Sequence, residues 1–234
     1  MPDPQGGVRL TPVRTILLKG MRSTIARKLR QSVATQPLVT LHVTCDASAL
    51  ISLHQGRRAR WEQEAGCSVT LTAVVAFLVV QALRRDGRLN GWVQQDAVEL
   101  YGEVHLGVAV ALEDGLIVPV VHDAHTLSLP GLARRVTDLA ARAKEGRLLP
   151  EEVLGSTFTI TNLGAYGIDF FTPILNPPQI GILGVGRTRP SGPGTARGLS
   201  LTFDHGAVDG ARAAQWLQNL IGLVERPEES FRDT

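Results

Sequence analysis

Apolar side chains recur at helical spacing in five stretches of the chain. In residues 19–34 they follow one another every four positions, which places them on one face of a helix. The nearly continuous apolar run in 70–85 predicts a helix that is buried on all sides. The same spacing predicts three further helices, at 47–66 with Asp46 as the N-cap, at 129–146 and at 210–224.

Shorter stretches alternate between apolar and polar or β-branched residues, which is the period of a β-strand. Residues 38–44 show this alternation directly after Pro37. Residues 105–112 and 116–121 flank a turn and predict a hairpin. Because hairpins and helical crossovers are both present, we expect an α/β fold with one mixed sheet covered by helices. Further strands are expected at 97–100, 157–161, 179–186 and 199–203.

Composition and charge narrow the class of protein. Apolar residues make up 44% of the chain and charged residues 20%, which is the usual mixture for a globular domain. The net charge is only +2, the arginines are scattered, and no aromatic residues are interleaved with them. Nucleic acid is therefore not an expected partner.

Neither a membrane segment nor a secretion signal is expected. The longest apolar run, residues 73–83, is interrupted by Gln81 and is too short to cross a bilayer. The first seven residues lack the hydrophobic region of a signal peptide. We therefore expect a cytoplasmic protein without membrane contact. A flexible segment rich in Pro, Gly and Gln at 1–10 is expected to precede one folded domain at 11–234.

Two cysteines are too few for a disulfide framework, and Cys45 and Cys67 do not have the spacing of metal ligands. We expect two small, buried or half-buried thiols, because a catalytic thiol would need a histidine partner that the local sequence lacks. The remaining histidines outside the C-terminal segment show no metal-ligand arrangement either, and we expect them to be solvated or hydrogen-bonded; they are His42, His54, His105, His122 and His125.

One histidine stands out because of its place in the chain. His205 follows a predicted strand and precedes a glycine-containing turn into a helix, where a rigid scaffold can present a side chain on a loop. A neutral imidazole there suits a general base for a thiol or a hydroxyl. Asp204 and Asp209 flank it and can orient the ring or organise the loop. Taken alone, however, a histidine with nearby aspartates in a turn is more often a structural capping cluster than a catalytic site, and the spacing does not decide between the two.

A second candidate is the hydroxyl-rich stretch at 156–164, which runs into Asn162 and Gly164. One of its hydroxyls can donate to an oxyanion. The alternative is that Thr157, Thr159 and Thr161 form a solvent-facing row of a half-buried strand, because Thr is a good strand former.

The glycines at 181, 184 and 186 do not form a nucleotide-binding loop. The segment lacks the Lys-Ser/Thr pair of a P-loop and the spacing of a dinucleotide fingerprint. We interpret these glycines as positions where another part of the backbone comes close, or where the strand bends.

Taken in order along the chain, six blocks of sequence resemble the catalytic domain of the dihydrolipoamide acyltransferases of 2-oxoacid dehydrogenase complexes, over about residues 11–224. The blocks are R-S-T-I-A-R-K-L-R-Q-S from Arg22, L-N-G from Leu89, H-L-G-V-A-V-A-L-E-D-G-L-I-V-P-V-V from His105, G-S-T-F-T-I-T-N-L-G from Gly155, F-T-P-I-L-N-P-P-Q-I-G-I-L-G-V-G from Phe171 and D-H-G-A-V-D-G-A from Asp204.

This resemblance implies a fold, an assembly and a reaction. The fold would be the chloramphenicol-acetyltransferase-like two-layer α/β sandwich, with a mixed sheet covered by helices. The chain would form homotrimers with the active site between subunits, and the trimers can build larger cubic or dodecahedral cores. The reaction would be reversible acyl transfer between CoA and a dihydrolipoyl thiol, without a metal, and acetyl, succinyl and branched acyl groups all remain open.

The resemblance also implies roles for three residues. His205 would deprotonate the reacting thiol, and Thr161, at the position where the family has Ser or Thr, would hydrogen-bond the oxyanion. Asp209, at the family's acidic or amide position, would help to hold the geometry of the site. The resemblance implies that His205 and Thr161 of one site come from neighbouring subunits.

The sequence departs from the family pattern at three points. Gly206 stands where the family usually has Arg, so an ion pair is expected to be lost and the loop to be looser. Leu38 stands where many relatives have His, which is expected to alter the substrate channel. The chain also shows no lipoyl domain or subunit-binding segment. We expect either a core cut from a longer protein, or a lipoyl group supplied by another domain or chain.

Two other functions remain open at the level of sequence. The first is acyl transfer from acyl-CoA to a different small acceptor, which would explain a catalytic core that stands alone. The second is a core scaffold without catalytic activity, for which Gly206 is the only hint.

Overall fold

All five predicted helices are present, within two residues of the predicted limits. They are α1 (Gly20–Thr35), α2 (Ser48–Ala65), α3 (Leu71–Arg85), α4 (Leu129–Lys144) and α5 (Gly210–Glu225). The computed structural model describes residues 12–113 and 115–231, so the segment at 1–10 lies outside the described residues. The predicted N-cap is wrong by one position, because Ala47 occupies the cap of α2 while the Asp46 carboxylate accepts the N–H of Ser48 at 2.8 Å.

The strands agree with the alternation, with three differences. The last two strands are longer than predicted and run over Gly181–Ser191 and Gly194–Asp204. The stretch at 105–112 is divided into two strands, and so is the stretch at 116–121, where Pro119 has no N–H to continue a ladder. A short strand at Gly91–Gln94 was not predicted. The strands are β1 (Leu38–Asp46), β2 (Gly91–Gln94), β3 (Ala97–Leu100), β4 (Leu106–Val108), β5 (Val110–Leu112), β6 (Gly115–Ile117), β7 (Val120–Val121), β8 (Phe158–Asn162), β9 (Gly181–Ser191) and β10 (Gly194–Asp204).

Six of these strands form one mixed sheet in the order β1-β10-β9-β8-β4-β7. β8 runs parallel to both β9 and β4, and the other neighbours are antiparallel. β2–β3 and β5–β6 are separate two-stranded hairpins. Short 3-10 helices complete the chain, namely η1 (Gly87–Leu89), η2 (Ala124–Thr126), η3 (Pro150–Val153), η4 (Gly164–Tyr166) and η5 (Pro227–Phe231).

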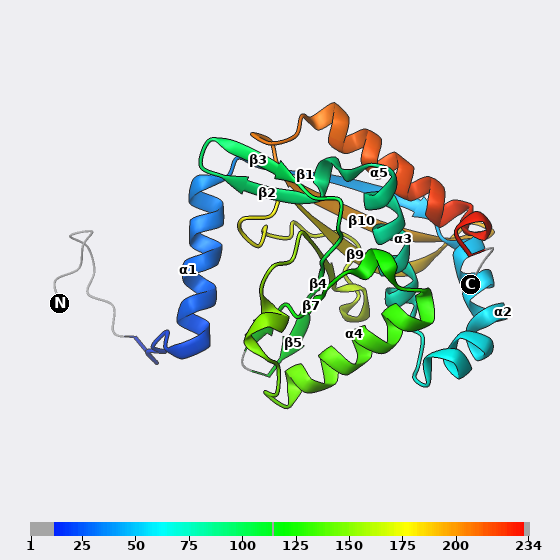
Figure 1. Ribbon diagram of the computed structural model, residues 1–234, viewed down its shortest axis with the longest axis horizontal. Coiled ribbons are helices and arrows are strands. Elements are labelled where there is room, and N and C mark those ends of the chain that lie inside the picture. The colour runs from blue at the N-terminus through cyan, green and yellow to red at the C-terminus, as the bar shows by residue number, and fades with distance from the viewer. Residues whose placement is uncertain (1–11, 114, 232–234) are drawn as a thin grey trace.

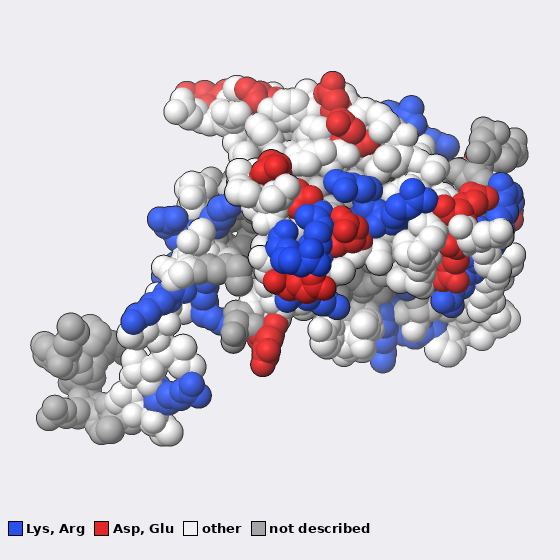
Figure 2. Space-filling view, turned by 60° about the horizontal axis from the view of Figure 1, so that its bottom comes forward, with Lys and Arg blue, Asp and Glu red and all other residues white. Residues whose placement is uncertain are grey.

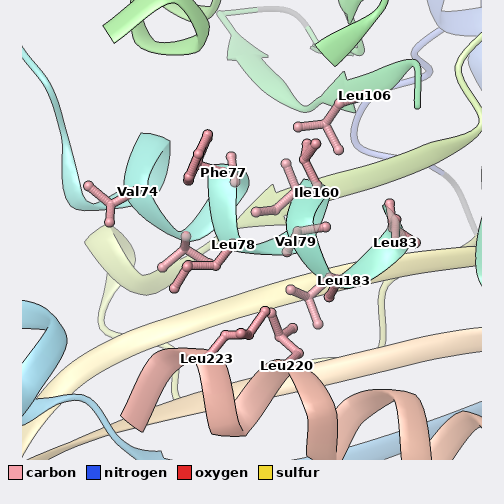
Figure 3. Close-up of a cluster of buried hydrophobic side chains, with 14 of the residues drawn as sticks. Val74, Phe77, Leu78, Val79, Leu83, Leu106, Ile160, Leu183, Leu220 and Leu223 are labelled. Carbon is pink, nitrogen blue, oxygen red and sulfur yellow. The ribbon is translucent and has the colours of Figure 1, made fainter. Parts of the chain in front are cut away.

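The helices α2 to α5 form a layer on one face of this sheet, while α1 lies at the edge of the molecule (Figure 1). Apolar side chains of α3 and α5 meet those of β8 and β9 between the two layers (Figure 3). Trp216 of α5 is fully buried, with its ring 5.6 Å from that of Phe158 in β8. The expected arrangement of one mixed sheet covered by helices is therefore confirmed.

The surface carries both signs of charge. Basic and acidic side chains are interspersed over the body of the molecule (Figure 2). On α2, for example, Arg58 pairs with Glu62 at 2.9 Å and Arg60 with Glu64 at 2.8 Å. Among the described residues, no helix combines the length and the apolar character needed to cross a membrane.

A buried ion pair ties α4 to the segment that leads into β8. Arg142 holds both carboxylate oxygens of Glu152, each at 2.6 Å, and Glu152 also accepts the N–H of Leu149 at 3.0 Å. The hydrogen bonds from Arg142 lower the pKa of Glu152 to about 2. Only 11% of the Glu152 side chain is exposed, so solvent screens this pair weakly.

We expect Glu152→Gln to destabilise the protein at neutral pH by about 1–3 kcal/mol, because one charge-assisted hydrogen-bond partner is lost. The pKa of Glu152 is lower in the folded protein, so this stabilisation is present above the ordinary glutamate pKa of 4.5 and is lost as the pH falls from there towards about 2. Urea unfolding of both proteins between pH 7 and pH 3 measures the difference. A difference that stays constant over this range would contradict the assignment.

We expect Leu78→Ala, in the centre of α3, to lower the free energy of unfolding by about 2–5 kcal/mol, because Leu78 is fully buried and its truncation leaves a cavity. Leu149, which is 52% exposed, is the control, and Leu149→Ala should change stability by no more than about 0.5 kcal/mol. Urea denaturation at one fixed protein concentration compares the two. Equal costs would show that the layer between α3 and the sheet is not the core.

Candidate active site

The threonines of β8 lie on the face of the sheet that points away from the helical layer. Thr157, just before β8, donates to Asn90 at 2.6 Å, and Thr159 donates to Gln179 at 2.8 Å. Both threonines are 1% exposed, so the prediction of a solvent-facing threonine row is wrong. The reason is that Gln179 and its neighbours fold back over this face of the sheet. Thr161 differs, since its hydroxyl has no hydrogen-bond partner among the described residues.

Thr161 lines a cavity of about 560 Å³. Its walls come from segments far apart in the sequence: one face of α1, the β6 hairpin strand, the end of η3, and residues 171–176. The lining is mostly apolar, and Lys28 is the only charged side chain that the described part of the chain contributes to it. The apolar side chains that line it include Ile25, Leu29, Ile117, Leu154, Phe171 and Ile174.

Glycines in β9 and β10 let the loop at 163–176 lie directly on the sheet. A Cβ on Gly186 would stand 1.9 Å from the carbonyl oxygen of Asp169, and a Cβ on Gly198 would stand 2.1 Å from it. A Cβ on Gly184 would stand 2.8 Å from the ring of Phe171. The interpretation of the glycines in this region as close approaches is therefore confirmed, and Phe171 is brought beside Thr161, which pairs with Gly184.

His205 lies at the opposite end of the sheet, immediately after β10. Its backbone N–H donates to the carbonyl of Pro37 at 2.9 Å, and its ring stacks on Phe203 with centroids 5.9 Å apart. The side chain is exposed, and its ring nitrogens have no hydrogen bond with the described residues. A Cβ on Gly210 would stand 3.8 Å from Nε2, so the ring lies close to the first turn of α5.

The two aspartates that flank His205 have different environments. Asp204 is 2% exposed and accepts the N–H of Gly206 at 2.8 Å and the side-chain amide of Gln36 at 3.2 Å. Neutral donors thus satisfy this carboxylate. Asp209 is the N-cap residue of α5, is exposed, and makes no side-chain capping hydrogen bond. Asp204 therefore organises the loop, and Asp209 is left open to solvent.

Asp209 belongs to a second cavity, of about 610 Å³, that does not include Thr161. Arg88, Tyr101 and Arg212 also line it. Burial and the hydrogen bond to Glu99 raise the pKa of Tyr101 to about 12, so its phenol stays protonated near neutral pH. The cavity lies between η1, the β2–β3 hairpin and the start of α5.

The sheet register separates the two catalytic candidates within one chain. Thr161 pairs with Gly184, and Gly184 pairs with Ser200, five residues before His205 in β10. With a rise of about 3.3 Å per residue and strands about 4.8 Å apart, Thr161 and His205 are roughly 15–20 Å apart. Thr161 and His205 of the same chain therefore cannot act on one thioester.

The cysteines and the remaining histidines fit the expectations for them. Cys45 is buried and Cys67 half-buried, both free, and burial raises the pKa of Cys45 to about 11, which keeps it an unreactive thiol. No group of three or more metal-ligating side chains was found within the described residues. Each of the five histidines is hydrogen-bonded, with ring partners Ser200 for His42, Val69 for His54, Asp123 for His105, Glu151 for His122 and Val104 for His125.

The sequence interpretation missed two polar residues that shape the site. Gln179 is 1% exposed and binds Thr159 and Ser156, which ties the end of the loop to β8. Gln36 links α1 to Asp204 and to the carbonyl of Gln179. The only signal in the sequence is that both glutamines adjoin a proline, which is too weak to predict a buried network.

Known proteins with similar sequences cover nearly all of the chain. The model of the family "2-oxoacid dehydrogenases acyltransferase (catalytic domain)" matches residues 11–232. The dihydrolipoyllysine-residue acetyltransferase component of the acetoin cleaving system of Bacillus subtilis is 42% identical over 91% of this chain and 55% of its own length. The chain spans about half the length of the curated relatives it matches most extensively.

Solved structures with similar folds point to the same family. The dihydrolipoamide acetyltransferase of Azotobacter vinelandii is 27% identical with a TM-score of 0.87, and 93% of each chain is covered. The cubic core of the pyruvate dehydrogenase multienzyme complex has the same identity, TM-score and coverage. Chloramphenicol acetyltransferase, at 13% identity and a TM-score of 0.55 over 86% of this chain and 92% of its own, shows the expected fold alone. The chain belongs to the family of 2-oxoacid dehydrogenase acyltransferase catalytic domains.

Proposed function

We propose that this chain transfers an acyl group between CoA and a dihydrolipoyl thiol, with His205 as the general base and Thr161 as the oxyanion donor. The observation that carries the proposal is that both groups are available. Thr157 and Thr159 each donate to a partner, whereas the hydroxyl of Thr161 has none among the described residues. Thr161 also lines a cavity. The imidazole of His205 is exposed and unpaired with any described residue.

The reaction needs a base because a thiol is a weak nucleophile until it loses its proton. His205 takes the proton of the attacking thiol, and the sulfur forms a bond to the carbonyl carbon of the thioester. When the tetrahedral intermediate collapses, the bond between the carbonyl carbon and the sulfur of the original thioester breaks. The leaving thiolate takes the proton back from the imidazolium. The same steps run in either direction, so transfer is reversible.

Thr161 stabilises the intermediate by donating its hydroxyl hydrogen to the oxyanion. A donor that is already in place costs no reorganisation as the charge develops, and one such donor is worth about 10²–10³ in rate. The side chains around Thr161 are mostly apolar, and a less polar surrounding strengthens such a hydrogen bond. We assign Asp209, four residues after His205 at the start of α5, to holding the geometry of the site only in the assembled oligomer, because its carboxylate makes no capping hydrogen bond within one chain.

The complete site forms between two copies of the chain. The roughly 15–20 Å between Thr161 and His205 of one chain supports this arrangement. In it, the His205 end of one chain meets the Thr161 cavity of its neighbour. A homotrimer has three such equivalent interfaces. In the Azotobacter enzyme, a serine, a histidine and an asparagine four residues after the histidine were studied for their roles in catalysis.

The substrates and partners follow from the same reaction. CoA or acyl-CoA is one substrate, and the second is a lipoyl group carried by another domain or another chain. The similarity to a cubic core supports assembly of the trimers into a larger particle that acts with the other components of a 2-oxoacid dehydrogenase complex. No step of this chemistry requires a metal.

We expect His205→Ala to lower kcat by about 10²–10⁴, because the general base is removed, and Thr161→Val to lower it by about 10²–10³, because the oxyanion donor is removed. The assay is thiol release from acetyl-, succinyl- and isobutyryl-CoA with dihydrolipoamide as the acceptor. Thr44→Val is the matched control, since Thr44 is an exposed strand threonine on β1 and its variant should keep wild-type turnover.

Wild-type turnover in the His205→Ala protein would overturn the role of the base. The absence of turnover in the wild type with all three acyl-CoA substrates would overturn the proposed reaction. In that case an acyl-CoA-dependent transfer to another small acceptor, or an inactive scaffold, would replace it.

A further inference from the structure

One wall of the Thr161 cavity is the loop at 163–176, which we call the covering loop. It crosses β9 and β10 without forming a strand of its own. Asp169 anchors its middle, with its carboxylate 2.7 Å from Nε of Arg187 and 3.7 Å from Nε of Arg189. The carbonyl of Ile168 accepts the N–H of Arg187 at 2.8 Å. The next residues, Phe170 and Phe171, have no such charged anchor.

His42 meets the covering loop from the edge strand β1. Its ring packs edge-on against Phe170, with the centroids 5.6 Å apart and the planes at 68°. Its Nδ1 lies 2.9 Å from the hydroxyl of Ser200, its partner in the β1–β10 register. His42 is exposed, whereas Ser200 is 1% exposed.

The Ser200 hydroxyl connects His42 to Phe171, which lines the cavity. It accepts the backbone N–H of Phe171 at 3.4 Å. Because a hydroxyl has one donor and two acceptor sites, Ser200 can hold the N–H of Phe171 and Nδ1 of His42 at the same time, in either tautomer of the ring. The ring of Phe171 lies against Gly184, beside Thr161.

We propose that His42 is a positioning residue for the acyl site, which it serves by holding Phe170 with its ring and Phe171 through Ser200. This inference rests on the proposed function, because it assigns the cavity beside Thr161 to the acyl group. Two strands, β10 and β9, lie between the strand of His42 and that of Thr161, so His42 touches no reacting atom. It fixes the aromatic wall against which the acyl group binds.

Two substitutions separate the two contacts of His42. His42→Phe keeps a ring against Phe170 and loses the hydrogen-bond partner of Ser200. His42→Asn keeps a side-chain amide, which can donate or accept, near the position of Nδ1 and loses the ring. Phe171 contacts the acyl group equally in the ground state and the transition state, so its displacement weakens uniform binding. We expect His42→Phe and Ser200→Ala each to raise KM for acetyl-CoA about 3- to 10-fold with kcat within about twofold.

The His42→Phe/Ser200→Ala double variant should be no worse than either single variant, because both remove the same connection. His42→Asn should restore KM to within about twofold of the wild type. Thr40→Val is the matched control, since it removes a similar 2.7 Å hydroxyl contact between β1 and β10, to Thr202, that does not reach the covering loop. Thr40→Val should leave KM unchanged.

A readout that is independent of turnover is amide hydrogen exchange of residues 168–174. We expect exchange there to be about 3- to 10-fold faster in His42→Phe and in Ser200→Ala than in the wild type, and unchanged in Thr40→Val. Exchange at wild-type rates in both variants would overturn the positioning role even if the protein is an active acyltransferase. Faster exchange in both variants of a protein that shows no acyl transfer would support the positioning role of His42 and overturn only the proposed function.

An equal fall in kcat and kcat/KM in His42→Phe would also overturn the inference, since it would place His42 in the stabilisation of the transition state. Additive effects in the double variant would show that His42 and Ser200 act separately.

Discussion

The register of β8, β9 and β10 is the constraint on which the account of the site depends. The strands cannot slip past one another by one residue, because such a slip would turn the helix-facing side chains of Ile160 and Leu183 to the opposite face of the sheet. The same ladders hold Thr161 near the middle of the sheet and leave His205 beyond the end of β10. The core that stabilises the fold therefore also keeps the two proposed catalytic groups of one chain, His205 and Thr161, apart.

The glycines of β9 and β10 have a related effect on the second face of the sheet. Side chains at 184, 186 or 198 would collide with Phe171 or with the backbone of Asp169. Without them, the covering loop lies directly on the strands, and Thr161 is enclosed between this loop, α1 and the β5–β6 hairpin. A strand that would otherwise be open to solvent on one face becomes the floor of an apolar cavity, where a single hydroxyl donor is most effective.

Much of the fold could be predicted from local pattern, because each helix carries its own apolar stripe or apolar run. The divided hairpin could not, since whether a strand continues past Pro119 depends on its neighbours in the sheet. The threonine alternation correctly indicated two faces of β8, but which face is covered depends on Gln179 and on a loop that closes in three dimensions. His205 and Thr161 were identified through family resemblance, and no local pattern reports their separation.

The most direct test of the central claim is complementation between two inactive variants. His205→Ala and Thr161→Ala chains are co-expressed in equal amounts, and the mixed oligomers are assayed for acyl transfer. If His205 and Thr161 of each site come from different chains, about a quarter of the sites in randomly mixed trimers contain both intact groups, and activity returns to about that fraction of wild type. If mixed oligomers form and remain as inactive as each variant alone, the shared site is contradicted.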